Sequence, residues 1–133
     1  MPLTLADAQK AITGAHAKAG QLEIRVTAAI VDEGGLLIAL GRMDGAGSLT
    51  PQIAEAKAVG AAMLQRDGAG LAELAKDRPG FFRVADRLVR VPIVPGLGSV
   101  LIRRDGKVVG AMGVSGGRPE QDVECAEAGL SSI

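Results

Sequence analysis

The chain has few aromatic residues and little cysteine, and this shortage excludes several classes of function. Phe81 and Phe82 are the only aromatic residues among 133, and tryptophan and tyrosine are absent. Proteins that recognise single-stranded nucleic acid by base stacking depend on such side chains, so we do not expect that mode of binding. The single cysteine, Cys125, excludes an intrachain disulfide and a cysteine-rich zinc site.

An excess of one charge and long apolar runs are also missing. Fifteen basic and fifteen acidic residues give a formal net charge of zero, so no overall field attracts nucleic acid or an anionic membrane. No apolar run approaches the roughly 20 residues of a transmembrane helix. Residues 1–22 are amphipathic and contain Asp7, which is not typical of a signal peptide. We therefore expect one cytoplasmic domain over residues 1–133, without nucleic-acid or membrane partners.

Helical and strand patterns alternate along the chain. Predicted helices cover residues 5–19, 50–66, 71–76 and 119–130, and predicted strands cover 24–31, 36–42, 88–93, 99–104 and 107–115. Asp32–Gly35 and Asp105-Gly106 are typical of tight turns, so they predict two hairpins. This order of elements predicts an α+β domain in which helices pack against an antiparallel sheet.

The most informative segment runs from Asp105 to Gly117 and reads DGKVVGAMGVSGG. Glycines within a strand mark close approach of a ligand or of another backbone. Gly116 and Gly117 precede a helix with Pro119 at its first position, and such a helix start leaves backbone N–H groups free for an anion. Ser115, Gly116 and Gly117 are therefore candidate ligand-binding residues.

Lys57 is the most unusual charged residue, because a helical wheel places it about 40° from the apolar face of an alanine-rich helix. It can pack its stem and extend its ammonium to water. Alternatively, it is a partly buried cation that faces a pocket, where it binds an anion or acts with a lowered pKa. The sequence leaves both interpretations open.

Three further residues are candidates for binding. Arg42 and Asp44 lie where a predicted strand runs into a glycine-rich loop, an arrangement that suits anion recognition with Asp44 orienting Arg42. The other interpretation is a solvated arginine and a turn aspartate. His16 is the only histidine, at the edge of the apolar face of the first helix. It is either a packed or surface residue or a ligand or acid–base group.

Taken in order, these motifs resemble the small haem-binding, or haem-degrading, domain family of GlcG-type and HbpS-type proteins and the C-terminal domain of PduO-type proteins. The resemblance covers nearly the whole chain. It rests on the alanine-rich first helix and on Val31–Leu37, Arg42–Ala46, Ala56–Ala58, Asp105–Gly117 and Glu120–Asp122. It implies an α+β fold with a five-stranded antiparallel sheet and packed helices in a profilin- or roadblock-like layout, and a homo-oligomer.

The resemblance also implies a ligand. Some members bind haem through a histidine on the first helix, which His16 matches, so the leading expectation is a small-ligand-binding protein for haem or a related tetrapyrrole. His16 would bind the iron, and Arg42 or Lys57 would pair with propionates. The segment Pro92–Ile102 departs from the usual pattern of the family, which leaves the ligand open.

An enzyme is the alternative expectation. Under this alternative, the chain is a cofactor-free isomerase, tautomerase or hydratase that acts on a small carboxylated or carbonyl catabolic intermediate. Lys57 and Arg42 would hold the anion and stabilise an enolate with help from the Gly116 and Gly117 amides. Asp122 or Asp44 would move the proton.

A third expectation is an oligomeric scaffold in which alanine- and glycine-rich surfaces pack against copies of the chain.

Overall fold

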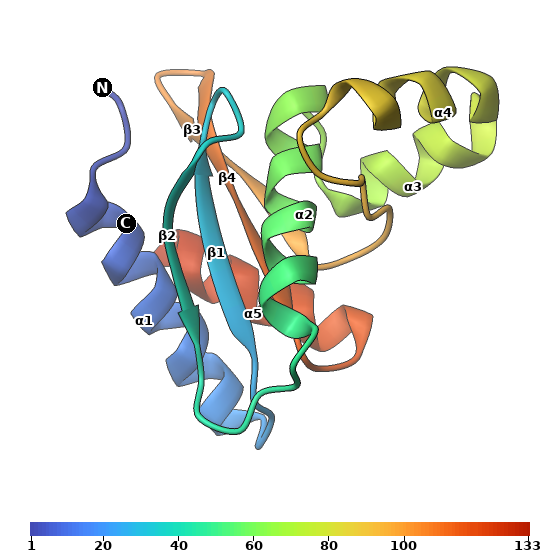
Figure 1. The fold of residues 1–133 in the computed structure, drawn as a ribbon. Helices are drawn as coiled ribbons and strands as arrows, with labels where there is room; N and C mark the ends of the chain where they lie inside the picture. Colours follow the sequence, from blue (N-terminus) through green and yellow to red (C-terminus); the bar gives the residue numbers. More distant parts are fainter.

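The computed structural model describes residues 1–133 as an antiparallel sheet with helices on both faces (Figure 1). The sheet contains four strands in the order β2-β1-β4-β3. The strands are β1 (Thr27–Asp32), β2 (Leu37–Arg42), β3 (Ser99–Arg104) and β4 (Lys107–Ser115). The helices are α1 (Leu5–Gln21), α2 (Thr50–Leu64), α3 (Gly68–Asp77), α4 (Pro79–Leu88) and α5 (Pro119–Ser131). The predicted α+β class and both predicted hairpins are confirmed.

Side chains of the two central strands, β1 and β4, point alternately to the two faces of the sheet and form two apolar layers. Ala28 and Ile30 of β1, with Met112 and Val114 of β4, pack toward α1 and α5. The intervening residues face α2, with Val31 among them, because successive side chains of a strand point to opposite sides. Both faces of the central strands are therefore covered, while β2 and β3 form the edges of the sheet.

α2 lies unusually close to the sheet, and the glycine-rich segment explains why. A Cβ atom at Gly113 would overlap the carbonyl oxygen of Ala54 and would lie 2.7 Å from the backbone nitrogen of Ala58. Both of these residues belong to α2, so the glycine admits a helix backbone at this position. The close approach predicted from the strand glycines is confirmed here, and the approaching group is a helix.

The predicted fifth strand at residues 88–93 is wrong. Pro79 begins α4, which continues to Leu88, and no strand occupies residues 89–98. Proline is favoured at the first position of a helix, where its missing N–H costs nothing. Pro92 and Pro95 cannot donate a ladder hydrogen bond, which disfavours a strand in the following segment.

The remaining differences are in element bounds and length. α3 begins earlier than predicted, at Gly68, where Asp67 caps the helix by accepting a hydrogen bond from the Gly70 N–H at 2.9 Å. β1 begins at Thr27, after Glu23 adopts a left-handed backbone conformation with φ of 58°. None of the five helices combines the length and the apolar character that crossing a bilayer requires.

Candidate functional site

Lys57 is a buried member of α2, and its ammonium does not reach water. Only 9% of the side chain is exposed, although its neighbours on the helix are mostly alanine. Its Nζ donates to the carbonyl oxygen of Val114 at 2.9 Å and to Oδ2 of Asp122 at 3.2 Å. A buried charge is tolerated only with such partners. Lys57 therefore joins α2 to the end of β4 and to the first turn of α5.

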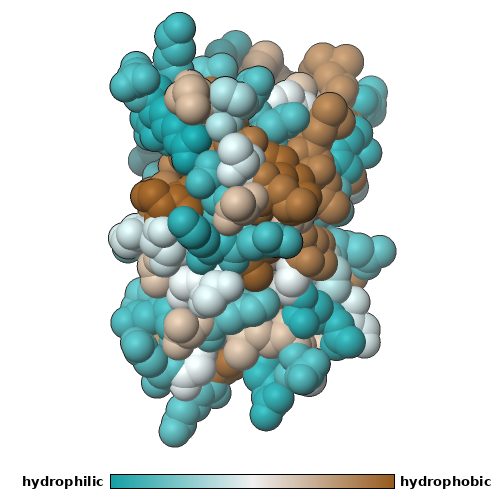
Figure 2. Space-filling view, turned by 90° about the vertical axis from the view of Figure 1, so that its left-hand side faces the viewer, coloured by the Kyte–Doolittle hydropathy of each residue, from teal (hydrophilic) through white to brown (hydrophobic).

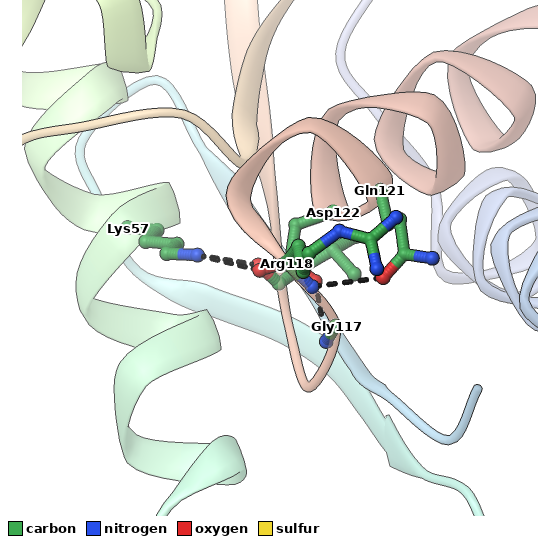
Figure 3. Close-up of polar contacts among 6 residues, drawn as sticks. Lys57, Gly117, Arg118, Gln121 and Asp122 are labelled. Atoms are coloured by element: carbon green, nitrogen blue, oxygen red, sulfur yellow. Dashed lines mark hydrogen bonds and ion pairs between the residues drawn. The ribbon is translucent and has the colours of Figure 1, made fainter.

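Asp122 completes this polar cluster (Figure 3), which consists of Lys57, Val114, Gly117 and Asp122. Its second oxygen, Oδ1, accepts the Gly117 N–H at 2.8 Å, and only 5% of its side chain is exposed. The next N–H, that of Arg118, donates to Oε1 of Gln121 at 2.9 Å. Side chains of α5 thus bind the orphan N–H groups that begin their own helix.

The electrostatics of Asp122 are dominated by burial. Loss of solvent raises the pKa of this carboxyl above its usual 3.8, against the lowering effects of the Gly117 N–H and of Lys57. The carboxylate is therefore stabilised less by its partners than it is penalised by leaving water. A pair of this kind is held by packing around it rather than by net attraction.

Two residues next to the cluster were not predicted individually, although both lie in the segment Pro92–Ile102 that departs from the family pattern. Gly98 has φ of 122°, and a Cβ atom there would lie 2.5 Å from Nζ of Lys57, so this position requires glycine. Ser99 is buried, and its Oγ has no hydrogen-bond partner. Both follow the irregular Pro92–Leu97 segment, and only the folded chain shows that they lie beside α2.

The other predicted ligand-binding residues are placed differently. Arg42 is exposed and donates from Nη1 to the carbonyl oxygen of Ala46 at 3.0 Å. Asp44 is also exposed, and its carbonyl accepts a hydrogen bond from Nη1 of Arg25 at 2.7 Å. Arg42 is the last residue of β2 and Asp44 lies in the loop after it, and neither side chain makes a hydrogen bond to the polar cluster.

Ser115 and Gly116 lie at the end of β4. Ser115 is buried opposite Thr27 of β1, whose hydroxyl bonds to that of Thr50 at 2.9 Å. Gly116 is exposed in the turn that leads to α5. The structure therefore joins Lys57, Gly117 and Asp122 by hydrogen bonds, and it places Ser115 and Gly116 in the adjoining stretch of chain.

His16 occupies a separate place, on α1 beside the edge strand β2. The imidazole is half-buried, and its Nε2 lies 2.9 Å from the carbonyl oxygen of Gly41. Because a carbonyl only accepts, Nε2 is the donor in this hydrogen bond, and in the neutral imidazole Nδ1 then carries the lone pair. A Cβ atom at Gly41 would lie 3.1 Å from Cε1 of His16, so the ring rests directly on the strand.

Comparison with known proteins gives one family over almost the whole chain. The model of the family described as "Haem degrading protein HbpS-like" matches residues 3–131. A 15.0 kDa protein from the dhaT-dhaS intergenic region of Citrobacter freundii is 31% identical over 96% of this chain and 89% of its own length. Protein GlcG of Escherichia coli K12 is 35% identical over 68% of this chain and 63% of its own length.

A solved structure agrees with these sequence matches. The crystal structure of a PduOC:heme complex superposes with a TM-score of 0.88 at 27% sequence identity. The match covers 100% of this chain and 96% of the PduOC chain. Haem is therefore the ligand crystallised with a close structural relative.

Proposed function

This chain belongs to the HbpS-like family of haem-degrading proteins, and from that premise we propose that it binds haem and that His16 would hold the iron. The full-length likeness to the PduOC:heme complex supports the ligand. The hydrogen bond between His16 and Gly41 supports the assignment of His16 as the iron ligand, and the proposal depends mainly on this observation. When bound, haem supplies iron-centred redox chemistry.

The geometry of His16 fits the demands of metal ligation. Histidine ligands usually donate their other ring N–H to a carbonyl or carboxylate, which fixes the tautomer and the ring orientation. Gly41 accepts in this way from Nε2 at 2.9 Å. Nδ1 is then the nitrogen that would bind the iron. A single histidine would be enough to hold haem, because the cofactor brings the other nitrogen ligands of its iron with it.

Arg42 is the residue that would meet a haem propionate. It follows Gly41 at the end of β2, and because successive strand side chains point to opposite faces, its side chain leaves the strand on the face away from the His16 ring, so only its far end can reach a haem edge. Its guanidinium is exposed and has one neutral partner, the carbonyl of Ala46. Arginine binds carboxylates through paired N–H groups. The ammonium of Lys57 is already bonded to Asp122 and Val114, so we assign it no part in propionate binding.

A haem titration of the apoprotein followed by absorbance tests this proposal. We expect a saturable Soret band that His16→Ala abolishes and that added imidazole partly restores, because free imidazole can occupy the vacated ligand position. The matched control is Lys10→Ala, which removes an exposed side chain from the same helix and should leave the band unchanged. A band of equal strength and affinity in wild type and His16→Ala would overturn the assignment of His16.

Arg42→Gln separates the propionate contact from ligation. We expect the Soret position to stay constant while haem affinity falls by roughly three- to tenfold, the loss typical of one partly exposed charge-assisted contact. Unchanged affinity would remove Arg42 from the site. If wild type itself shows no saturable band, the haem proposal fails as a whole.

The enzyme alternative receives less support from the polar cluster. Both oxygens of Asp122 have partners within the chain, and the Gly117 N–H, which was to assist an anion, already donates to Oδ1. We therefore assign Lys57 and Asp122 a structural role, in which each provides the partner that the other's buried charge requires. Turnover of a carbonyl substrate that Lys57→Met abolishes without loss of stability would reverse this assignment.

A further inference from the structure

α4 leaves much of its apolar side at the surface. Phe81 is 44% exposed, Val84 is 56% exposed and Leu88 is 79% exposed. Their spacing of three and four residues places the three side chains on one side of the helix. We call these three residues the α4 ridge. Other apolar residues of α4 pack inward, with Ala85 buried among them, so the helix has more apolar surface than the domain core covers.

The α4 ridge lies on a part of the molecule that projects from the sheet. In Figure 1, α3 and α4 form a pair of helices that stands clear of the strands. α1, α2 and α5 all pack against strands, whereas α4 packs against α3. Contiguous exposed apolar surface of this kind marks an interaction site.

The charges beside the α4 ridge are positive. Residues 78–90 contain four arginines and one acidic residue, Asp86, whose carboxylate already accepts a backbone N–H at 2.6 Å. Two of these arginines have partners within the chain. The other two, Arg83 and Arg87, are exposed and form no ion pair. With 3.6 residues per turn, Arg87 lies about 60° around the helix from Val84, so free cations border the ridge.

We propose that α4 docks on an anionic lipid surface, with the α4 ridge in the interfacial region and Arg83 and Arg87 at the level of the phosphates. Helices that lie in a membrane interface combine exposed apolar side chains with a cationic polar face. The apolar side chains gain free energy by leaving water, and arginine binds phosphate oxygens through paired N–H groups. A flat bilayer also suits a ridge that projects, whereas a protein partner would need a matching groove.

This proposal departs from the expectation of no membrane partner, which rested on the net charge of zero. The cations of α4 are a local exception to that balance. Docking needs no helix that crosses the bilayer, because only side chains of the ridge enter the interface.

Docking through α4 would leave the His16 side of the molecule in water. Figure 1 places α1 and α4 at opposite sides of the domain, and Figure 2 looks onto the side that carries α1 and β2. The proposed haem site therefore stays open while α4 is bound. The two proposals are independent, so the test of docking uses the apoprotein.

Cosedimentation of the apoprotein with vesicles tests the role of the α4 ridge. We expect wild type to bind phosphatidylglycerol vesicles, and Leu88→Gln to weaken binding by about tenfold, because a polar side chain gains little from entering the interface. Leu36→Gln is the matched control. It makes the same change at a leucine that is 60% exposed in the turn between β1 and β2, and it should leave binding unchanged. Circular dichroism checks that both variants are folded.

The lipid charge and the two free arginines provide a second test. Binding to phosphatidylcholine vesicles should be at least about tenfold weaker than to phosphatidylglycerol vesicles, and the double variant Arg83→Gln with Arg87→Gln should lose a similar factor on the anionic vesicles. Wild type that binds neither vesicle, or binds both equally, overturns the proposal. So does binding that Leu88→Gln and the arginine variant leave intact. An oligomer that Leu88→Gln dissociates, without vesicle binding, would assign the ridge to a second copy instead.

Discussion

Lys57 and His16 both project from inner faces of helices, but they differ in how many of their polar atoms already have a partner. This difference suggests a structural role for Lys57 and a ligand-binding role for His16. Lys57 is buried, and its ammonium is bonded to a carboxylate and a carbonyl. His16 is half-buried and uses one ring nitrogen, while the other keeps its lone pair. A polar group whose partners all lie within the chain has a structural role. One with binding capacity left over at the surface is available to a ligand.

The largest expected effect follows removal of the Lys57 ammonium. Lys57→Met leaves the Asp122 carboxylate buried without its cation, which should cost about 3–5 kcal/mol of unfolding free energy. The urea midpoint measures the loss. Haem binding per folded molecule should be unchanged, because His16 lies on α1, away from the polar cluster.

The double variant Lys57→Met with Asp122→Asn is the control for this loss. It removes both charges, while the amide oxygen of asparagine can still accept the Gly117 N–H. We expect it to recover much of the stability lost in Lys57→Met. If the double variant is no more stable than the single one, uncompensated charge is not the cause.

The pH dependence of stability tests the same cluster on a smaller scale. Because burial raises the pKa of Asp122 above 3.8, the folded chain takes up this proton before the unfolded chain does. The contribution of Asp122 to stability therefore increases as pH falls through that raised pKa toward 3.8. Asp122→Asn lacks this proton uptake, so its urea midpoint should fall more steeply on acidification than that of wild type.

Asp7 supplies the opposite case for comparison. Its hydrogen bond from Arg104 lowers the pKa of the carboxyl below 3.8, so its contribution is present above that pH and is lost as pH falls through the lowered pKa. Asp7→Asn should therefore make the acid loss shallower than in wild type. Parallel profiles for wild type and Asp122→Asn would show that Asp122 does not titrate in this way.

Local patterns were enough to predict most of the fold. Apolar periodicity and turn residues depend on neighbours in the chain, so they located the hairpins and the helices that begin and end the domain. At residues 79–98 the local signals conflicted. Pro79 favours a helix start, and Pro92 and Pro95 disfavour a strand, yet the apolar residues between them also suited a strand.

The candidate site was predictable only in part, because periodicity assigns a residue to a face but does not identify its partner. A helical wheel placed Lys57 near the apolar face of α2. Its partner Asp122 is 65 residues away, and the ion pair depends on how α2 and α5 pack at the end of β4. The role of Gly98 depends on the ammonium of Lys57, which lies beside it only in the folded chain. The link between His16 and Gly41 likewise depends on where α1 crosses β2.

The smallest expected effect on stability comes from His16→Ala. The variant removes one half-buried hydrogen bond to the Gly41 carbonyl, which should cost about 0.5–1.5 kcal/mol. The same variant should have the largest effect on haem affinity, whereas Lys57→Met should show the reverse pair of effects. The urea midpoint of the apoprotein and a haem titration are measured for both variants. If the two sites have different roles, His16→Ala mainly lowers haem affinity and Lys57→Met mainly lowers stability. A large stability loss in His16→Ala with unchanged haem affinity would mean that this imidazole is a packing residue of the α1–β2 contact.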